Sequence, residues 1–136
     1  MALSLGVIAA LVALATGLGL LHRALSGRVR HVTKQLDLPE EVVLGSDATL
    51  LQFSTEICSP CKATHTVLDG LAREREGLTH VDLDITHRGE LAAKYNILQT
   101  PTTLILDASG TVRARIGGAA RRDTIVAELD RIRVAA

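Results

Sequence analysis

The chain has 136 residues, of which 47% are apolar, and Phe53 and Tyr95 are its aromatic residues. A chain of this length is close to the usual size of one domain, and its core must be built from Leu, Ile, Val and Ala. Fifteen basic and fifteen acidic residues cancel, and basic side chains do not gather with aromatic ones as they do in nucleic-acid-binding proteins. We therefore expect no nucleic-acid partner.

The first predicted element is a membrane-spanning helix. Residues 2–21 carry no charged side chain, and as a helix they would span about 30 Å, the thickness of a bilayer core. A soluble helix would show a polar face, and only Ser4 and Thr16 are polar here. A cleaved signal peptide is the alternative, because residues 13–15 resemble a cleavage site, but no basic side chain precedes the apolar run. We assign residues 1–22 to a single transmembrane anchor in the cell membrane.

The basic residues after this run predict its orientation. Residues 1–34 contain four basic and no acidic side chains, whereas residues 35–111 contain five basic and twelve acidic ones. The basic residues of the first group are Arg23, Arg28, Arg30 and Lys34. Positively charged flanks stay in the cytoplasm, so we expect the domain on the cytoplasmic side, with an extracytoplasmic domain as the alternative.

Residues 23–47 are expected to form a basic linker leading into the domain, with at most a short strand or helix, and residues 48–136 the domain itself. Apolar runs and alternating patterns predict strands, at residues 49–54, 79–85, 102–106 and 111–116. Helical spacing predicts helices, from the cysteines to Gly77, at residues 90–95 and at residues 124–134. Strands and helices alternate before a hairpin closes the sheet, which predicts an α/β fold with a mixed β-sheet.

Both cysteines of the chain, Cys58 and Cys61, lie between the strand at residues 49–54 and the helix after it. With Cys58 at the N-terminus of that helix, Cys61 lies one turn further along the same face, close enough for a disulfide. The helix dipole and Lys62 favour the thiolate form of Cys58, and Pro60 suits the first helical turn. This arrangement predicts Cys58 as the nucleophile and Cys61 as the resolving thiol.

Other uses of a C-x-x-C pair fit the sequence less well. Structural zinc needs four ligands, usually with a second pair at comparable spacing, and His65, His80 and His87 show no such pairing. Haem attachment would require a histidine where Lys62 stands. Two inert core thiols are the remaining alternative, but redox pairs occur where this motif lies, between a strand and a helix. We expect a redox pair, no metal ion and no cofactor.

From about Asp47 onward the chain resembles the thioredoxin family. The likeness rests on FSTEICSPCK after a strand, on Thr100-Pro101-Thr102 at the start of the next-to-last strand, and on Gly117-Gly118 before the last helix. The resemblance implies a thioredoxin-like mixed sheet flanked by helices and a cis Thr100-Pro101 bond against the cysteine pair. It also implies that the main chain at Thr100 pairs with an extended substrate peptide.

Three positions depart from the family pattern. The tryptophan before the first cysteine is Ile57 here, the proline of the active-site helix is Thr66, and the buried acid beneath the second cysteine is Gln52. An amide cannot accept the proton that the resolving thiol must lose, so Glu56 or water would have to accept it. His80 occupies a strand position that often holds a lysine near that acid. A histidine there could titrate near neutral pH, but a plain polar residue at a strand edge is the favoured interpretation.

The sequence thus predicts a membrane-anchored thiol–disulfide oxidoreductase that acts on dithiol or disulfide-containing proteins and exchanges electrons with a redox partner. The site residues are the catalytic Cys58 and Cys61, the substrate-binding Thr100 and Pro101, and the supporting Ser59, Pro60, Lys62, Gln52 and Glu56. Ser59 and Pro60 separate the two thiols but do not by themselves fix the direction of electron flow. The alternative is a non-catalytic thioredoxin-fold adaptor tethered to the membrane, which the loss of the family's acid and tryptophan favours.

Overall fold

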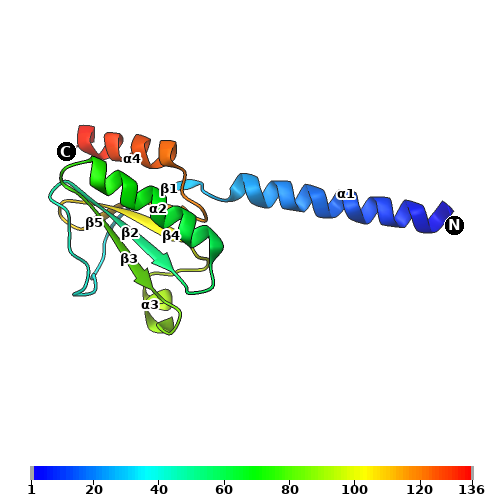
Figure 1. Ribbon diagram of the computed structural model, residues 1–136, viewed down its shortest axis with the longest axis horizontal. Coiled ribbons are helices and arrows are strands. Elements are labelled where there is room, and N and C mark those ends of the chain that lie inside the picture. The colour runs from blue at the N-terminus through cyan, green and yellow to red at the C-terminus, as the bar shows by residue number, and fades with distance from the viewer. Residues whose placement is uncertain (1, 136) are drawn as a thin grey trace.

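The computed structural model describes residues 2–135 as a five-stranded sheet with flanking helices and one long helix projecting from it (Figure 1). The elements in chain order are α1 (Ala2–Leu25), β1 (Val29–Gln35), β2 (Ala48–Ser54), α2 (Ser59–Glu74), β3 (Leu78–Asp84), α3 (Gly89–Lys94), β4 (Thr102–Asp107), β5 (Thr111–Gly117) and α4 (Arg122–Ala135). The strand order is β1-β5-β4-β2-β3, with β2 and β3 parallel and every other pair antiparallel. The predicted α/β class with a mixed sheet is confirmed.

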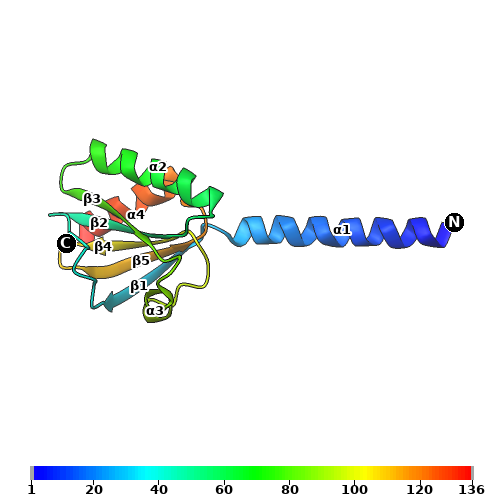
Figure 2. The ribbon, with the colours of Figure 1, turned by 60° about the horizontal axis from the view of Figure 1, so that its bottom comes forward.

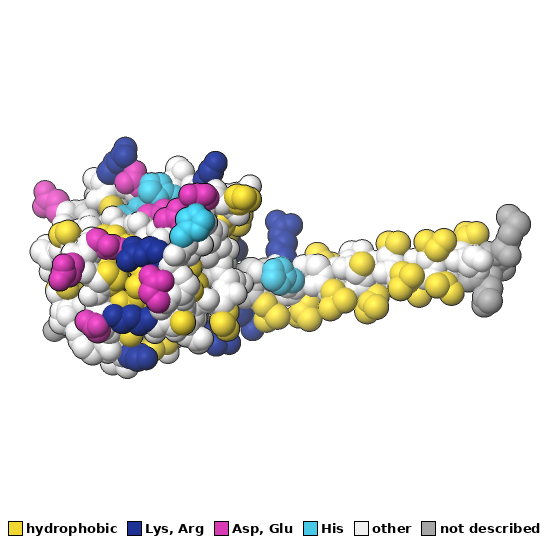
Figure 3. All heavy atoms as spheres, turned by 90° about the horizontal axis from the view of Figure 1, so that it is seen from below, with side chains coloured by type: hydrophobic (Ala, Val, Ile, Leu, Met, Phe, Trp, Pro, Cys, Tyr) yellow, Lys and Arg dark blue, Asp and Glu magenta, His cyan; other side chains and the backbone are white. Residues whose placement is uncertain are grey.

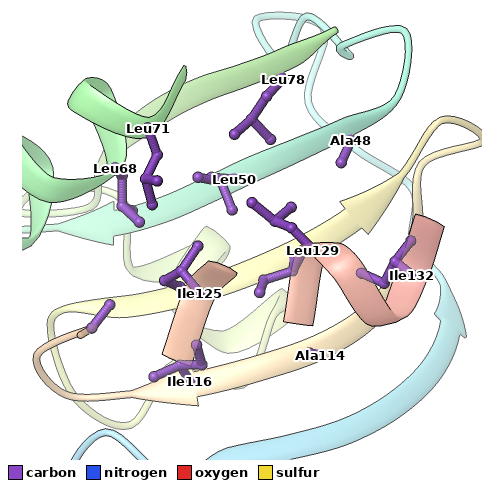
Figure 4. Packing of buried hydrophobic residues seen from close by; sticks show 12 residues of the cluster. Ala48, Leu50, Leu68, Leu71, Leu78, Ala114, Ile116, Ile125, Leu129 and Ile132 are labelled. Carbon is purple, nitrogen blue, oxygen red and sulfur yellow. The ribbon is translucent and has the colours of Figure 1, made fainter. Parts of the chain in front are cut away.

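Strand β2 is buried along its whole length because it lies between β3 and β4 and both of its faces are covered. Its side chains alternate, so that Leu50 belongs to one apolar cluster and Leu51 and Phe53 to the other. Helices α2 and α4 cover the first face (Figure 2). Figure 4 shows how side chains of these helices meet the sheet, including Leu68, Leu71, Ile125 and Leu129 around Leu50.

Helix α3 and the segment before β2 cover the second face of the sheet. The two aromatic rings of the chain meet here, with the centroids of Phe53 and Tyr95 5.3 Å apart. The Tyr95 hydroxyl donates a hydrogen bond of 2.6 Å to the backbone oxygen of Asp37, and Leu36 and Leu38 pack against the same cluster. Residues 36–38, which we expected to belong to a linker, are therefore part of the folded domain.

Strand β1 also lies inside the segment that we expected to be a linker. It pairs with β5 at the edge of the sheet, so the folded domain begins at Val29 rather than at residue 48. The strand was hard to foresee because an edge strand with one covered face needs few apolar residues, and only Val29 and Val32 are partly buried in it. An irregular register between His31 and Lys34 weakens the alternating pattern further.

Helix α1 extends beyond the predicted anchor to Leu25 and projects from the sheet (Figures 1 and 2). The most apolar window within Ser4–Leu25 has a mean hydropathy of 2.2, none of this window is buried, and the helix is long and apolar enough to cross a membrane. Figure 3 shows apolar side chains along the helix, whereas the acidic side chains of that face lie on the domain.

The turn between α1 and the domain is tied to the rest of the fold. Gly27 has a φ of 76°, which glycine adopts most easily, and its N–H donates a hydrogen bond of 2.7 Å to the oxygen of Gly117. The N–H of Gly118, which follows Gly117 in the chain, donates a hydrogen bond of 2.8 Å to the backbone oxygen of Pro101. Helix α1 therefore leaves the domain beside the Thr100-Pro101 segment, at the end of the sheet where β2 passes into α2 (Figures 1 and 2).

The central position of Leu50 gives a test of the fold. Leu50→Ala should lower the free energy of unfolding by about 3 kcal/mol, because it removes buried methyl groups and leaves a cavity between β2 and the two helices. Val43, which is 68% exposed, is the matched control, and Val43→Ala should cost less than about 0.5 kcal/mol. Denaturant unfolding of both variants in mild detergent measures the difference, and equal losses would contradict the described core.

Candidate functional site

The two cysteines form a disulfide at the N-terminal end of α2, with their Cα atoms 5.3 Å apart. Cys58 is the N-cap residue of the helix, and Pro60 lies in its first turn, where a missing N–H group is not needed for helical hydrogen bonds. The two sulfur-bearing residues differ in accessibility, since Cys58 is half-buried and Cys61 is only 3% exposed. An incoming molecule therefore meets Cys58 first.

The charges around Cys58 favour its thiolate once the disulfide is reduced. The backbone N–H groups of the first turn of α2 point toward the N-cap position, where the helix dipole is positive. Residues Ser59, Pro60, Cys61 and Lys62, which form that turn, include one basic and no acidic side chain. Ser59 and Lys62 are both exposed, so Lys62 contributes a solvent-screened positive charge.

Gln52 lies directly beneath the second cysteine. Its side chain is fully buried on β2, and Nε2 donates a hydrogen bond of 3.0 Å to the backbone oxygen of Cys61. A carbonyl oxygen can only accept, so this contact fixes the orientation of the amide and directs Oε1 toward His80, whose Nε2 is 3.2 Å away. Gln52 thus joins the backbone of Cys61 to His80 through two hydrogen bonds.

A group of polar side chains continues from Gln52 between α2 and the edge of the sheet. His65 of α2 contacts Asp82 of β3, with 3.0 Å between Nδ1 and Oδ2, and the Ser54 hydroxyl donates to the same carboxylate. Asp82 is the register partner of Gln52 across the parallel pair β2 and β3. The pKa of His80 is lowered, first by burial and then by the neighbouring His65, while Asp82 opposes the shift. Burial of His80 therefore favours the neutral imidazole over the charged one.

Cys61 opens into a pocket of about 410 Å³ that holds several candidate proton acceptors. Glu56 lines this pocket together with His65 and Asp82. Glu56 itself is exposed, and its backbone N–H is fixed by a hydrogen bond of 2.9 Å to Oγ1 of Thr86. Glu56 was expected from the sequence as a proton acceptor, but His65 and Asp82 were not. His65 follows Cys61 at a spacing of four, which places both on one face of a helix.

The Thr100-Pro101 bond is cis, as the family resemblance implies. Pro101 is buried and Thr100 is half-buried. The hydroxyl oxygens of Thr100 and Thr55 are 3.3 Å apart, within hydrogen-bond distance. Since Thr55 directly follows β2 in the loop that leads to Cys58, this contact joins the loop of the cysteine pair to the loop of the cis bond.

Exposed apolar side chains accompany both loops. Ile57, the neighbour of Cys58, is 99% exposed, and Leu98, shortly before the cis bond, is 85% exposed. These two side chains stand where the resemblance places a tryptophan and the approach to the cis proline. Each of the two loops therefore carries one large apolar side chain that is exposed to solvent.

Comparisons with known proteins agree with this geometry. The model of the family described as Thioredoxin matches residues 29–131, which begin at β1. The chain is 36% identical to a thioredoxin of Pseudomonas aeruginosa over 93 residues, covering 67% of this chain and 85% of that protein. It is 35% identical to thioredoxin C-2 of Corynebacterium nephridii over 91 residues, covering 66% of this chain and 83% of that one.

Among solved structures, the fold is similar to the X-ray structure of Fasciola hepatica thioredoxin, with a TM-score of 0.55 and 23% identity over 64% of this chain and 82% of that chain. A second structure, titled as that of a malarial protein, gives a TM-score of 0.57 with 21% identity, covering 62% of this chain and 96% of that one. The chain belongs to the thioredoxin family, and its Cys58–Cys61 pair makes it a thiol–disulfide oxidoreductase.

Proposed function

We propose that the protein is a membrane-anchored thiol–disulfide oxidoreductase in which Cys58 attacks, Cys61 resolves, and Thr100 and Pro101 hold the substrate. The observation that carries the assignment of roles is the difference in exposure between the two cysteines at the start of α2, since Cys58 is half-buried and Cys61 is 3% exposed. Only the first can meet a disulfide on another protein without movement of the helix.

The reaction is a pair of exchange steps. In the reduced protein, the Cys58 thiolate attacks one sulfur of a substrate disulfide, which forms a mixed disulfide and releases the other substrate sulfur as a thiolate. The Cys61 thiol then loses its proton and attacks the Cys58 sulfur. This second step leaves the Cys58–Cys61 disulfide and a substrate dithiol. A dithiol redox partner then reduces the Cys58–Cys61 disulfide by the same kind of exchange and is itself oxidised to a disulfide.

The proton of Cys61 needs an acceptor other than Gln52, because the amide nitrogen donates to the Cys61 backbone and the amide oxygen accepts from His80. Glu56 and Asp82 line the pocket at Cys61, and a carboxylate that reaches the thiol through water can take the proton. This supports our expectation that Glu56 or water replaces the family's buried acid, and adds Asp82 as a second carboxylate.

Substrate binding rests on the loop that contains the cis bond. Thr100 precedes β4, and its backbone is available to pair with an extended peptide as an added strand would. The exposed Ile57 and Leu98 flank the cysteine loop and the cis loop and would contact apolar side chains of that peptide. Dithiol and disulfide-containing proteins are the substrates that this chemistry requires.

The proposal of a membrane anchor rests on α1. The most apolar window within Ser4–Leu25 has a mean hydropathy of 2.2, and none of that window is buried in the domain. A free helix of this composition would expose its apolar side chains to water, which is unfavourable. The basic residues after it favour a cytoplasmic domain under the positive-inside rule, and Arg23 and Arg28 lie near the boundary between helix and domain. A cytoplasmic domain would be kept reduced and would act as a reductase.

Two reporters fused after Ala136 test the anchor and its orientation. A reporter that fluoresces only in the cytoplasm should be active, and alkaline phosphatase at the same site should be inactive. The fusion should remain in the membrane fraction after alkaline carbonate washing and keep its original N-terminus. Active phosphatase would place the domain outside, and a soluble, shortened product would show that α1 is a cleaved signal sequence.

A further inference from the structure

Two histidines and an aspartate converge on the outer side of the polar group that begins at Gln52. His65 and Asp69 are four residues apart and therefore share one face of α2, and His80 faces them from β3. One ring nitrogen of each histidine and one carboxylate oxygen of Asp69 all lie within 4.8 Å of one another. The two imidazole rings meet edge to face, with their centroids 4.8 Å apart.

The hydrogen bonds of His80 determine which of its ring nitrogens carries a proton. The amide oxygen of Gln52 faces Nε2 of His80, because the amide nitrogen is committed to the Cys61 carbonyl. An amide oxygen can only accept, so Nε2 of His80 donates. In the neutral ring the other nitrogen, Nδ1, then bears a lone pair.

His65 is fixed by a corresponding contact on its own ring. Its Nδ1 lies 3.0 Å from a carboxylate oxygen of Asp82 and donates its proton there. The neutral ring then has its lone pair on Nε2. Histidines that bind metal ions almost always have their second nitrogen held in this way by a carboxylate, a carbonyl oxygen or water. Both histidines of this cluster therefore already have the outer partners that metal ligands require.

We propose that His65, Asp69 and His80 form a binding site for a divalent transition-metal ion, with Zn²⁺ as the best match. Imidazole nitrogen suits Zn²⁺, Cu²⁺ and Ni²⁺, whereas Mg²⁺ and Ca²⁺ prefer all-oxygen sites. Two histidines and one carboxylate are a known donor set for zinc with a fourth position left for water or another ligand. The cysteines contribute nothing to this site, because both are in the disulfide.

Small movements would complete the coordination. Ligands about 2.0–2.2 Å from a zinc ion lie no more than about 4 Å from each other, so the present separations must shorten slightly. The side chain of His65 is 49% exposed and that of Asp69 is 38% exposed, which permits this adjustment. Asp69 pairs with Arg73 at 2.7 Å, but the Arg73 side chain is 79% exposed, and such surface pairs are weak.

The site escaped the sequence analysis because its ligands come from different elements. His65 and His80 are separated by the rest of α2 and the turn before β3, so no short spacing marks them. The crossover from β2 through α2 to the parallel strand β3 brings them together. The expectation that the chain holds no metal ion rested on cysteine ligands and paired spacing, neither of which applies to this cluster.

Competition with a chromophoric zinc chelator tests the proposal on the full-length chain in detergent micelles. The chain is kept oxidised, so that its thiols cannot bind zinc. Wild type should bind one Zn²⁺ per chain and should not respond to Mg²⁺. His65→Ala and Asp69→Asn should each weaken zinc binding by about a hundredfold or more, since even the loss of an outer partner weakens metal affinity by about 10–100-fold.

A control variant and a second measurement separate this site from general histidine binding. His87 is exposed and lies outside the cluster, so His87→Ala should leave the zinc affinity unchanged. Nitrogen chemical shifts of the histidine rings should show zinc at Nε2 of His65 and Nδ1 of His80. The proposal is wrong if the oxidised wild type binds no zinc, or if His87→Ala weakens binding as much as His65→Ala does. Neither result depends on the membrane anchor or on catalysis.

Discussion

Cys58→Ser should lower the rate of disulfide exchange by about a thousandfold or more, and Cys61→Ser should instead accumulate mixed disulfides with substrate proteins. A serine hydroxyl at position 58 remains protonated at pH 7 and cannot replace the thiolate as the attacking group. In the second variant the attack proceeds because Cys58 is unchanged, but the buried thiol that releases the substrate is missing. The two variants therefore stop the reaction at different steps.

The measurement follows reduction of a protein disulfide by the full-length chain, with a chelator present to remove metal ions. Mixed disulfides are detected as adducts that disappear on treatment with a strong reductant. Ser46→Ala is a suitable control, because it changes an exposed residue outside the cysteine loop without removing either sulfur. Equal accumulation of adducts in the two cysteine variants would contradict the assignment of Cys58 as the nucleophile and Cys61 as the resolving thiol.

Gln52→Asp should speed release of the mixed disulfide at pH 7 by about tenfold while it lowers stability. Position 52 is fully buried next to the Cys61 backbone, so a carboxylate there would lie close enough to accept the thiol proton. Gln52→Asn is the matched control, because it shortens the side chain by the same amount and cannot ionise. The difference between the two variants isolates the effect of the acid.

The stability of these variants should depend on pH in a defined direction. Burial raises the pKa of a carboxyl group above its value of about 3.9 in the unfolded chain. The folded aspartate variant then binds more protons than its unfolded form between these two pKa values, so its stability falls as pH rises through that range. We expect a deficit of about 2–4 kcal/mol relative to Gln52→Asn at pH 8 that disappears below about pH 4.

Denaturant melts at several pH values measure this deficit, and single-turnover release of a mixed disulfide measures the rate. The aspartate variant could be destabilised as described and still release the mixed disulfide no faster than the asparagine variant. In that case Glu56, Asp82 or water already removes the Cys61 proton fast enough that it does not limit the rate of release. A deficit that does not change with pH would show that the carboxyl group at this position is not desolvated.

The sequence predicted best those parts of the fold in which a few neighbouring residues decide the structure. The apolar run of β2, the cysteine loop and the start of α2 are continuous in the chain, and the structure has each of them within a few residues of the prediction. The sequence allowed a short strand or helix before residue 48 but did not locate strand β1, because its partner β5 lies at the far end of the chain and its own residues are mostly exposed. Such an edge strand is defined by pairing more than by composition.

The polar side chains beneath Cys61 likewise could not be predicted from neighbouring residues, because they depend on strand pairing. The sequence indicated that Gln52 replaces a buried acid, but it could not show that the amide bridges Cys61 and His80. That contact depends on the register between β2 and β3, in which Gln52 faces Asp82. A shift of one residue would turn His80 to the other side of the sheet, so the environment of the resolving cysteine follows from strand pairing.

The short connection between α1 and the sheet would limit where the enzyme can work if α1 spans a membrane. Only Ser26, Gly27 and Arg28 separate α1 from β1, and three residues reach no further than about 10 Å even when extended. With α1 in a bilayer, the cysteine pair would stay within a thin layer at the membrane surface, on the side of the domain that faces the lipid. Partners anchored in the same membrane would then meet it at a high effective concentration, whereas freely diffusing proteins would have to enter the narrow space between domain and lipid.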